Sequence, residues 1–180
     1  MILEGRTLAA QIRQPLPQRA EVVRQKLGRP VGVRAISSTE DYGAYVYLKK
    51  EVAAAQELGV DTKVFEVDNQ TPVAEFLALV KNLSADKNVD AILIPRPLPE
   101  HLAATPYADL LAPQKDIDGM SNINAGNLFL CKTWPEILAL KGFAPCTAMA
   151  VIRLLEYHQI PLAGAEAAVI GRSSTCLFFT

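Results

Sequence analysis

The sequence predicts an α/β fold in which helices cover both faces of a mostly parallel sheet. Helix-like and strand-like patterns alternate over the first hundred residues, an order typical of α/β proteins. The third strand pattern, 89–94, is almost wholly apolar, as expected for a strand that is buried on both faces. The composition agrees, because 50% of the 180 residues are hydrophobic and 21% are charged.

The elements are expected in the order helix, strand, helix, strand, helix, strand. Apolar residues one turn apart indicate helical structure over 7–27, which Pro15 and Pro17 divide into two pieces. A strand is then expected over 31–36 and a helix over 42–58, which ends before a glycine. The remaining strand, helix and strand are expected over 62–67, after Pro72, and over 89–94.

The second half of the chain is expected to be less regular. A short helix over 108–111 leads into an irregular stretch, which is followed by a helix over 147–157 and a strand over 167–170. We place the domain boundary so that 1–120 form one domain and 121–180 the beginning of a second. A complete βαβ unit takes about 30 residues, so this second unit is expected to be an incomplete Rossmann-like domain.

Charge and composition exclude several classes of protein. The 18 Lys and Arg residues balance 19 Asp and Glu residues, so the basic excess of a nucleic-acid-binding protein is missing. No apolar run approaches the roughly 18 residues that span a bilayer, and charged residues interrupt the N-terminus where a signal peptide would have its apolar core. The three cysteines form no CxxC pattern, which favours reduced thiols in a cytoplasmic protein without a metal site.

Tyr45 and Lys49 are candidate site residues because they lie four apart on a predicted helix and therefore share a face. A ring beside an amine suits stacking on a flat heterocycle with a proton donor at its edge. The alternative is a solvated lysine on an amphipathic helix. The spacing is also that of the catalytic pair in short-chain dehydrogenases, but the glycine-rich nucleotide loop of those proteins is missing here.

Two acidic residues lie in the segment Lys115-Asp116-Ile117-Asp118-Gly119. One interpretation is a carboxylate that accepts hydrogen bonds from an amino-heterocycle, and the other is a turn stabilised by the aspartate side chains. A calcium loop would need a glutamate near Asn127, so calcium binding is excluded. Further on, an apolar run ends in Gly171 and Arg172, which is a weak form of a dinucleotide-binding turn because the later glycines are missing.

A series of motifs along 1–173 resembles the bifunctional methylenetetrahydrofolate dehydrogenase/methenyltetrahydrofolate cyclohydrolase family. In chain order they are EGR (4–6), YVYLK (45–49), ELGV (57–60), AILI (91–94) with PLP (97–99), KDIDG (115–119), NAG (124–126), PCT (145–147) and AVIGRS (168–173). The resemblance implies two α/β domains with a cleft between them. It also implies an enzyme that oxidises 5,10-methylenetetrahydrofolate with NADP and then hydrolyses the methenyl cation to 10-formyltetrahydrofolate.

The same resemblance implies roles for individual residues. Lys49 would assist the proton transfers of the hydrolysis, Tyr45 would stack against the folate, and Asp118 would anchor the pterin, so we expect these three to converge on one cleft. Contacts to NADP are implied for Thr147, Gly171, Arg172 and Ser173. The family pairs as homodimers, so a homodimer is also implied.

The sequence departs from the family pattern at three places. Pro95 stands where the family usually has a glutamine, and Ala148 and Ala150 replace a proline and a glycine. After Ser173 the nucleotide-binding pattern does not continue. We therefore expect a cofactor domain that is cut short and binds NADP weakly. The alternative function is a non-catalytic module that binds a folate or a partner.

Overall fold

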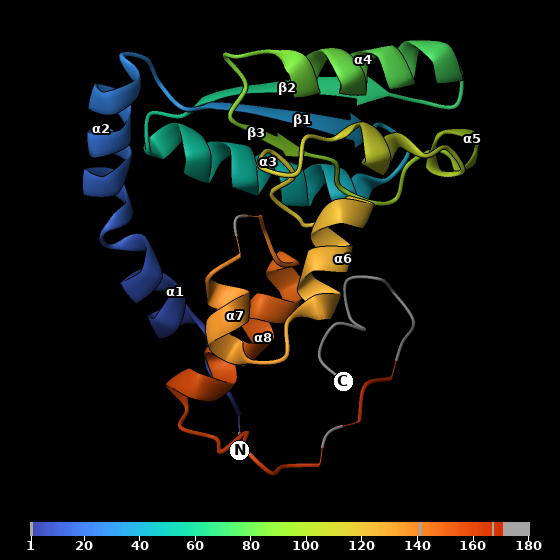
Figure 1. Cartoon of the computed structure of the whole chain (residues 1–180). Coiled ribbons are helices and arrows are strands. Elements are labelled where there is room, and N and C mark those ends of the chain that lie inside the picture. The colour runs from blue at the N-terminus through green and yellow to red at the C-terminus, as the bar shows by residue number, and fades with distance from the viewer. Residues whose placement is uncertain (1, 141, 167, 171–180) are drawn as a thin grey trace.

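The structure is a computed structural model that describes residues 2–140, 142–166 and 168–170. Its centre is a parallel sheet with the strand order β2-β1-β3, built from β1 (Gly32–Ser38), β2 (Asp61–Val67) and β3 (Ala91–Leu93). Helix α3 (Tyr42–Glu57) lies on one face and α4 (Val73–Ala85) on the other (Figure 1). The predicted α/β class and parallel sheet are confirmed.

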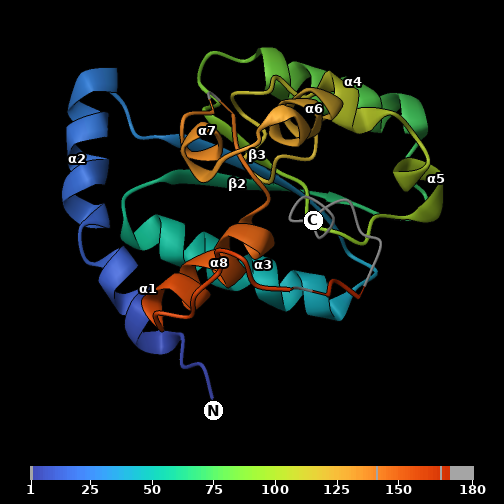
Figure 2. The ribbon, with the colours of Figure 1, turned by 60° about the horizontal axis from the view of Figure 1, so that its bottom comes forward.

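The N-terminal helical region is divided as expected. Helix α1 (Arg6–Arg13) is followed by α2 (Leu16–Leu27), and Pro15 and Pro17 lie at the start of the second helix. Both views place α1 beside the C-terminal helix α8 (Cys146–Tyr157) (Figures 1 and 2). A contact of 3.2 Å between His158 Nε2 and the Glu4 carbonyl oxygen joins these two parts of the chain.

The main hydrophobic core lies between α4 and the sheet. Phe76 and Val80 of α4 are fully buried and belong to one cluster with Ile36 of β1 and Ile92 of β3. The opposite face is packed less tightly, because Leu48 is the buried residue of α3. Two cavities therefore remain on the α3 side of the sheet.

Two expectations for the second half of the chain are wrong. The stretch expected to be irregular contains α6 (Asn122–Leu130) and α7 (Trp134–Leu138), and α6 forms because the Ser121 side chain caps it by accepting a hydrogen bond from the Asn124 amide at 3.2 Å. A strand was expected over 167–170, but residue 167 lies outside the described residues and 168–170 belong to no strand. The start of a Rossmann-like sheet is thus not seen in the described residues.

The remaining helices are short, and they are α5 (Glu100–Ala103) and the 3₁₀ helix η1 (Tyr107–Leu110). The second of these corresponds to the helix expected over 108–111. In the part of the chain that the structure describes, no helix has the length and apolarity needed to cross a membrane.

An ion pair joins the start of β1 to the start of β3. Arg29 donates two hydrogen bonds to the Asp90 carboxylate, at 2.6 and 2.9 Å, and the Gly32 amide donates a third at 2.7 Å. The bonds from Arg29 lower the pKa of Asp90. A carboxyl group whose pKa is lower in the folded state stabilises the fold at pH values above its unfolded pKa of about 4. This stabilisation is lost as the pH falls from there through the pKa of the folded state.

Asp90→Asn is therefore expected to lower the free energy of unfolding at pH 7 by only about 1 kcal/mol, because the paired side chains are 28% and 30% exposed and water screens them. The difference from the wild type should shrink as pH falls from about 5 to about 3. Urea unfolding at several pH values measures it, and a difference that is constant with pH would contradict the prediction.

Candidate active site

A cavity of about 570 Å³ lies on the α3 side of the sheet, and we call it the Asp118 pocket. Its walls come from α3, from the sheet, from the segment after β3 and from the first residues of α8. The polar or reactive side chains on its walls are Tyr47, Glu51, Thr62, Arg96, Asp118, Cys146 and Thr147, and Pro95 lies among them. Its volume is in the usual range for small-molecule sites, about 300–1,000 Å³.

Tyr47 and Glu51 line the Asp118 pocket from one face of α3, because residues four apart in a helix lie above one another. Partial burial and the hydrogen bond to Glu51 raise the pKa of Tyr47 to about 12, so the phenol keeps its proton at neutral pH. Partial burial and the neighbouring charge of Asp118 raise the pKa of Glu51, while the bond from Tyr47 opposes them.

Asp118 and Cys146 face each other on the opposite wall. Burial raises the pKa of Asp118, and the hydrogen bond from Cys146 and the positive charge of Arg96 oppose this rise. The pKa of the Cys146 thiol is raised to about 11 by loss of hydration and by the charge of Asp118. Cys146 is thus a protonated thiol at neutral pH and a poor nucleophile. Its Sγ donates to the Ile117 carbonyl oxygen at 3.5 Å, next to Asp118.

The two aspartates of the 115–119 segment have different tasks. Asp116 is 1% exposed and accepts hydrogen bonds from the Met120 amide at 3.0 Å, the Ser121 amide at 2.7 Å and Asn124 Nδ2 at 2.9 Å. These bonds hold the loop to the start of α6. The interpretation of a turn stabilised by an aspartate therefore applies to Asp116, whereas Asp118 lines the Asp118 pocket.

Tyr45 and Lys49 lie elsewhere. They line a separate cavity of about 400 Å³ between α3 and β2, and the residues that line the Asp118 pocket include neither of them. Lys49 Nζ lies 4.5 Å from the centre of the Tyr45 ring, and the bond to Tyr45 raises the pKa of this lysine. The expectation that these two residues converge with Asp118 on one cleft is therefore wrong.

The residues expected to contact NADP are only partly placed. Thr147 lies at the start of α8 and lines the Asp118 pocket, beside the residues of α3. Gly171, Arg172 and Ser173 lie outside the described residues. Pro95, the departure from the family pattern, also lines the Asp118 pocket and has no side-chain hydrogen bond to offer there.

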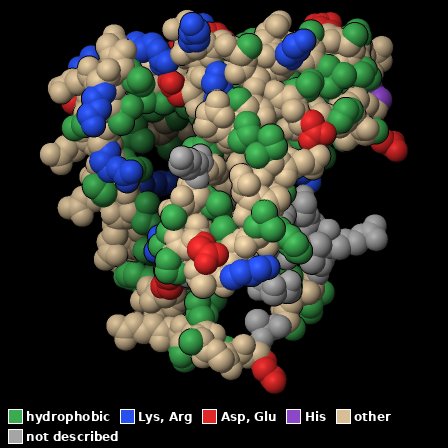
Figure 3. All heavy atoms as spheres, viewed as in Figure 1, with side chains coloured by type: hydrophobic (Ala, Val, Ile, Leu, Met, Phe, Trp, Pro, Cys, Tyr) green, Lys and Arg blue, Asp and Glu red, His purple; other side chains and the backbone are tan. Residues whose placement is uncertain are grey.

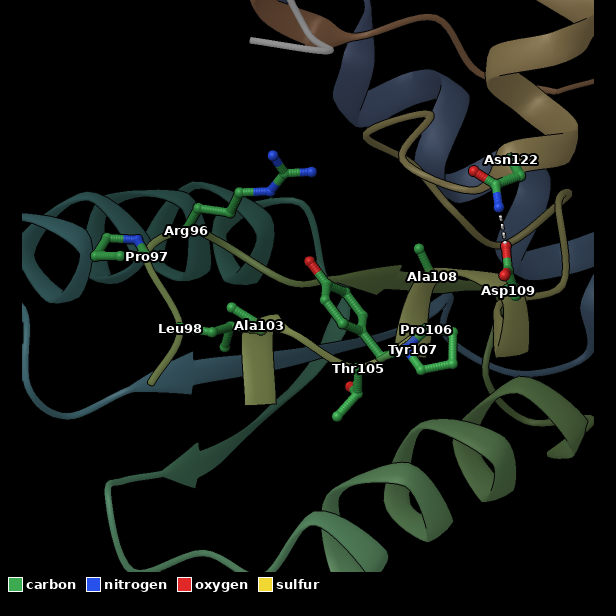
Figure 4. Close-up of a pocket in the computed structure, with 10 residues that line it drawn as sticks. All are labelled: Arg96, Pro97, Leu98, Ala103, Thr105, Pro106, Tyr107, Ala108, Asp109 and Asn122. Atoms are coloured by element: carbon green, nitrogen blue, oxygen red, sulfur yellow. Dashed lines mark hydrogen bonds between the residues drawn. The ribbon is translucent and has the colours of Figure 1, made fainter. Parts of the chain in front are cut away.

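A larger cavity, of about 810 Å³, adjoins the segment after β3 and was not predicted (Figure 4). Most of its lining is apolar. Arg96 lies at one end, and at the other the Asn122 amide donates a hydrogen bond of 2.6 Å to Asp109 (Figure 4). Arg96 lines both this cavity and the Asp118 pocket, so the two are neighbours.

The fold and the pocket define a parallel α/β domain in which phenol, carboxyl and guanidinium groups line one cavity of the size usual for small-molecule sites. Residues 3–118 match the family described as tetrahydrofolate dehydrogenase/cyclohydrolase, catalytic domain. The chain belongs to this family, and the resemblance recognised in its motifs is confirmed.

Relatives and solved structures agree with this assignment. The bifunctional protein FolD of Elusimicrobium minutum is 50% identical over 175 residues, which are 97% of this chain and 61% of that protein. The crystal structure of FolD from Campylobacter jejuni is 29% identical, with a TM-score of 0.85 over 98% of this chain and 60% of that one. A 5,10-methylenetetrahydrofolate dehydrogenase from the silkworm Bombyx mori is 32% identical, with a TM-score of 0.82 over 97% and 57%. The chain thus spans about three-fifths of the length of these proteins.

Proposed function

We propose that this chain acts in one-carbon metabolism, in the NADP-dependent oxidation of 5,10-methylenetetrahydrofolate to the methenyl form and its hydrolysis to 10-formyltetrahydrofolate. The observation that carries the proposal is the Asp118 pocket, whose α3 and Asp118 walls lie within the residues that match the family's catalytic domain. The Campylobacter jejuni FolD, which is named for both a methylenetetrahydrofolate dehydrogenase and a cyclohydrolase, supports it.

In this proposal residues 1–120 form the folate-binding catalytic domain and 121–180 belong to the NADP-binding domain. Asp118 anchors the substrate, because a carboxylate can accept two N–H bonds from an amino-heterocycle. Arg96, on the same walls, suits an anionic group of the substrate. The pocket is thus equipped for a flat ring with donors at one edge.

The described residues do not build a site for NADP. A dinucleotide site needs a strand that runs into a glycine turn and a helix, and residues 168–170 form no strand. Thr147 is the one expected NADP contact that is placed. Asp118 and its neighbours are therefore assigned to the folate alone.

The proposal is tested by titrating the purified chain with tetrahydrofolate in a calorimeter. Asp118→Asn is expected to weaken binding about 10- to 100-fold, because a hydrogen bond to a charged group contributes about 1.5–3 kcal/mol. Asp109→Asn is the matched control, since Asp109 lines the other cavity. Equal affinity of the wild type and Asp118→Asn would contradict the proposal.

Assays of the same chain for dehydrogenase and cyclohydrolase activity separate an enzyme from a non-catalytic module. Turnover of either reaction supports an enzyme. Folate binding without any turnover supports the alternative, a non-catalytic folate-binding module, and would leave the assignment of Asp118 in place.

We further propose a cytoplasmic location and a homodimer. Among the described cysteines, Cys131 and Cys146 are free thiols, which fits a reducing compartment. Helix α6 exposes the large side chains of Ile123, Phe129 and Leu130, and hydrophobic side chains are visible over this part of the surface (Figure 3). Exposed apolar groups of this kind favour association. Light scattering on the purified chain tests the dimer.

A further inference from the structure

The side chain of Glu51 carries a buried oxygen atom that lacks a partner. Within the described residues, Oε2 of Glu51 is inaccessible to solvent and makes no hydrogen bond. A buried acceptor without a partner costs about 1–3 kcal/mol, and more when it is charged. Such a group inside a cavity points to a ligand or a reaction that uses it.

Most of the titratable groups around Glu51 cannot exchange a proton at neutral pH. They are Tyr47 on the same helix, Arg96 after β3, Asp118 in the 115–119 loop and Cys146 at the start of α8. The phenol and the thiol, with pKa values of about 12 and about 11, keep their protons at neutral pH. Arginine does not lose its proton in proteins.

Two carboxyl groups are then left, and they differ in their partners. The Cys146 thiol and the positive charge of Arg96 both lower the pKa of Asp118. Glu51 has the bond from Tyr47, and its Oε2 has no partner among the described residues. Partial burial and the charge of Asp118 raise the pKa of Glu51. A carboxylate is a usual general acid or base in enzymes.

We propose that Glu51 is the acid–base residue of the Asp118 pocket and that it takes the role for which the motif pattern suggested Lys49. This inference rests on the proposed function. Lys49 lines the other cavity, beside Tyr45, and is not among the residues around Asp118. The structure thus brings a carboxylate, and not an amine, to the place where the folate would react.

The hydrolysis can be written with Glu51 as its only proton carrier. The oxygen of a water molecule forms a bond to the cationic carbon of methenyltetrahydrofolate, while one proton of that water moves to the Glu51 carboxylate. The bond between this carbon and one ring nitrogen then breaks, and the nitrogen keeps the electron pair and takes the proton from Glu51. The hydroxyl proton leaves to solvent as the formyl carbonyl forms, so one proton is released overall.

The experiment compares hydrolysis of methenyltetrahydrofolate by the wild-type chain and three variants, without NADP. Glu51→Gln keeps the shape of the side chain and is expected to slow hydrolysis about 10²- to 10⁴-fold. Glu57→Gln is the matched control, because Glu57 is an exposed residue at the end of the same helix. Lys49→Gln is the opposing variant, and loss of activity there with an active Glu51→Gln would overturn the proposal.

A pH profile separates catalysis from a merely structural role. A base must be ionised to act, so hydrolysis by the wild type should rise with pH through the pKa of Glu51, and Glu51→Gln should lack this acidic limb. Glu51→Asp keeps a carboxyl group, so it should be slower than the wild type but show the same rise with pH. Its activity would show that a change at this position does not simply unfold the protein. The same acidic limb in Glu51→Gln would overturn the proposal.

Calorimetric titration with methenyltetrahydrofolate distinguishes the failure of this proposal from the failure of the proposed function. A wild-type chain that binds this cation but does not hydrolyse it overturns the role of Glu51 and leaves the folate site standing. A wild-type chain that binds neither this cation nor tetrahydrofolate overturns both.

Discussion

Asp116→Ala is expected to lower the free energy of unfolding by about 2–5 kcal/mol. The carboxylate is 1% exposed and accepts three hydrogen bonds, from the Met120 and Ser121 amides and from Asn124 Nδ2. Its removal leaves two or more donors buried without an acceptor, and each costs about 1–3 kcal/mol. Urea unfolding at pH 7 measures the change.

Asp109→Ala is the matched control for this prediction. Its carboxylate accepts a single bond from Asn122, and this bond is exposed to solvent. We expect a change within about 1 kcal/mol, because water replaces an exposed bond at little cost. Similar losses for the two aspartates would mean that burial of Asp116 does not matter for stability.

The loss of Asp116 is also expected to weaken folate binding. Asp116 holds the loop that carries Asp118, and Lys115 ties the same loop to the end of α4 by donating to the carbonyl oxygens of Ser84 and Asp86 at 2.8 and 2.7 Å. The pocket residue therefore depends on its neighbours for its position. The position of Asp118 in the pocket is therefore set by the residues that hold its loop in place.

The first hundred residues could be predicted because their signals are local. The apolar run of β3, the prolines between α1 and α2 and the glycine after α3 act on residues close to them in sequence. Helices α6 and α7 were missed because their support is tertiary. Ser121, which caps α6, is itself held by the buried carboxylate of Asp116.

The site could be predicted only in part, for a geometric reason. Tyr45 with Lys49 and Tyr47 with Glu51 have the same spacing on α3, so periodicity alone cannot say which pair meets Asp118. The burial of Leu48 against the sheet sets the rotation of the helix and turns Tyr47 and Glu51 towards that loop. The loop that carries Asp118 could be predicted from the sequence. Which pair of α3 residues faces it could be seen only once the helix was packed against the sheet.

Gly119→Ala is expected to lower the free energy of unfolding by about 2–4 kcal/mol. Gly119 has a φ of +63°, where an alanine side chain costs about 1–2 kcal/mol. A Cβ atom at this position would also collide with the backbone carbonyl oxygen of Phe143, so the segment leading into α8 would have to move, at a further cost of about 1–3 kcal/mol. Thermal or urea unfolding measures the loss.

Gly126→Ala provides the control, because the same substitution should have the opposite sign there. Gly126 lies within α6, and a Cβ atom at this position meets no other atom within 4 Å. Alanine in a helix interior is favoured over glycine by about 0.5–1 kcal/mol, so this variant should be slightly more stable than the wild type. Since Gly119 lets the Asp118 loop approach the chain just before Cys146 and Thr147, Gly119→Ala should also weaken folate binding, and Gly126→Ala should not. A Gly119→Ala protein with wild-type stability and affinity would show that this close approach is not needed to form the pocket.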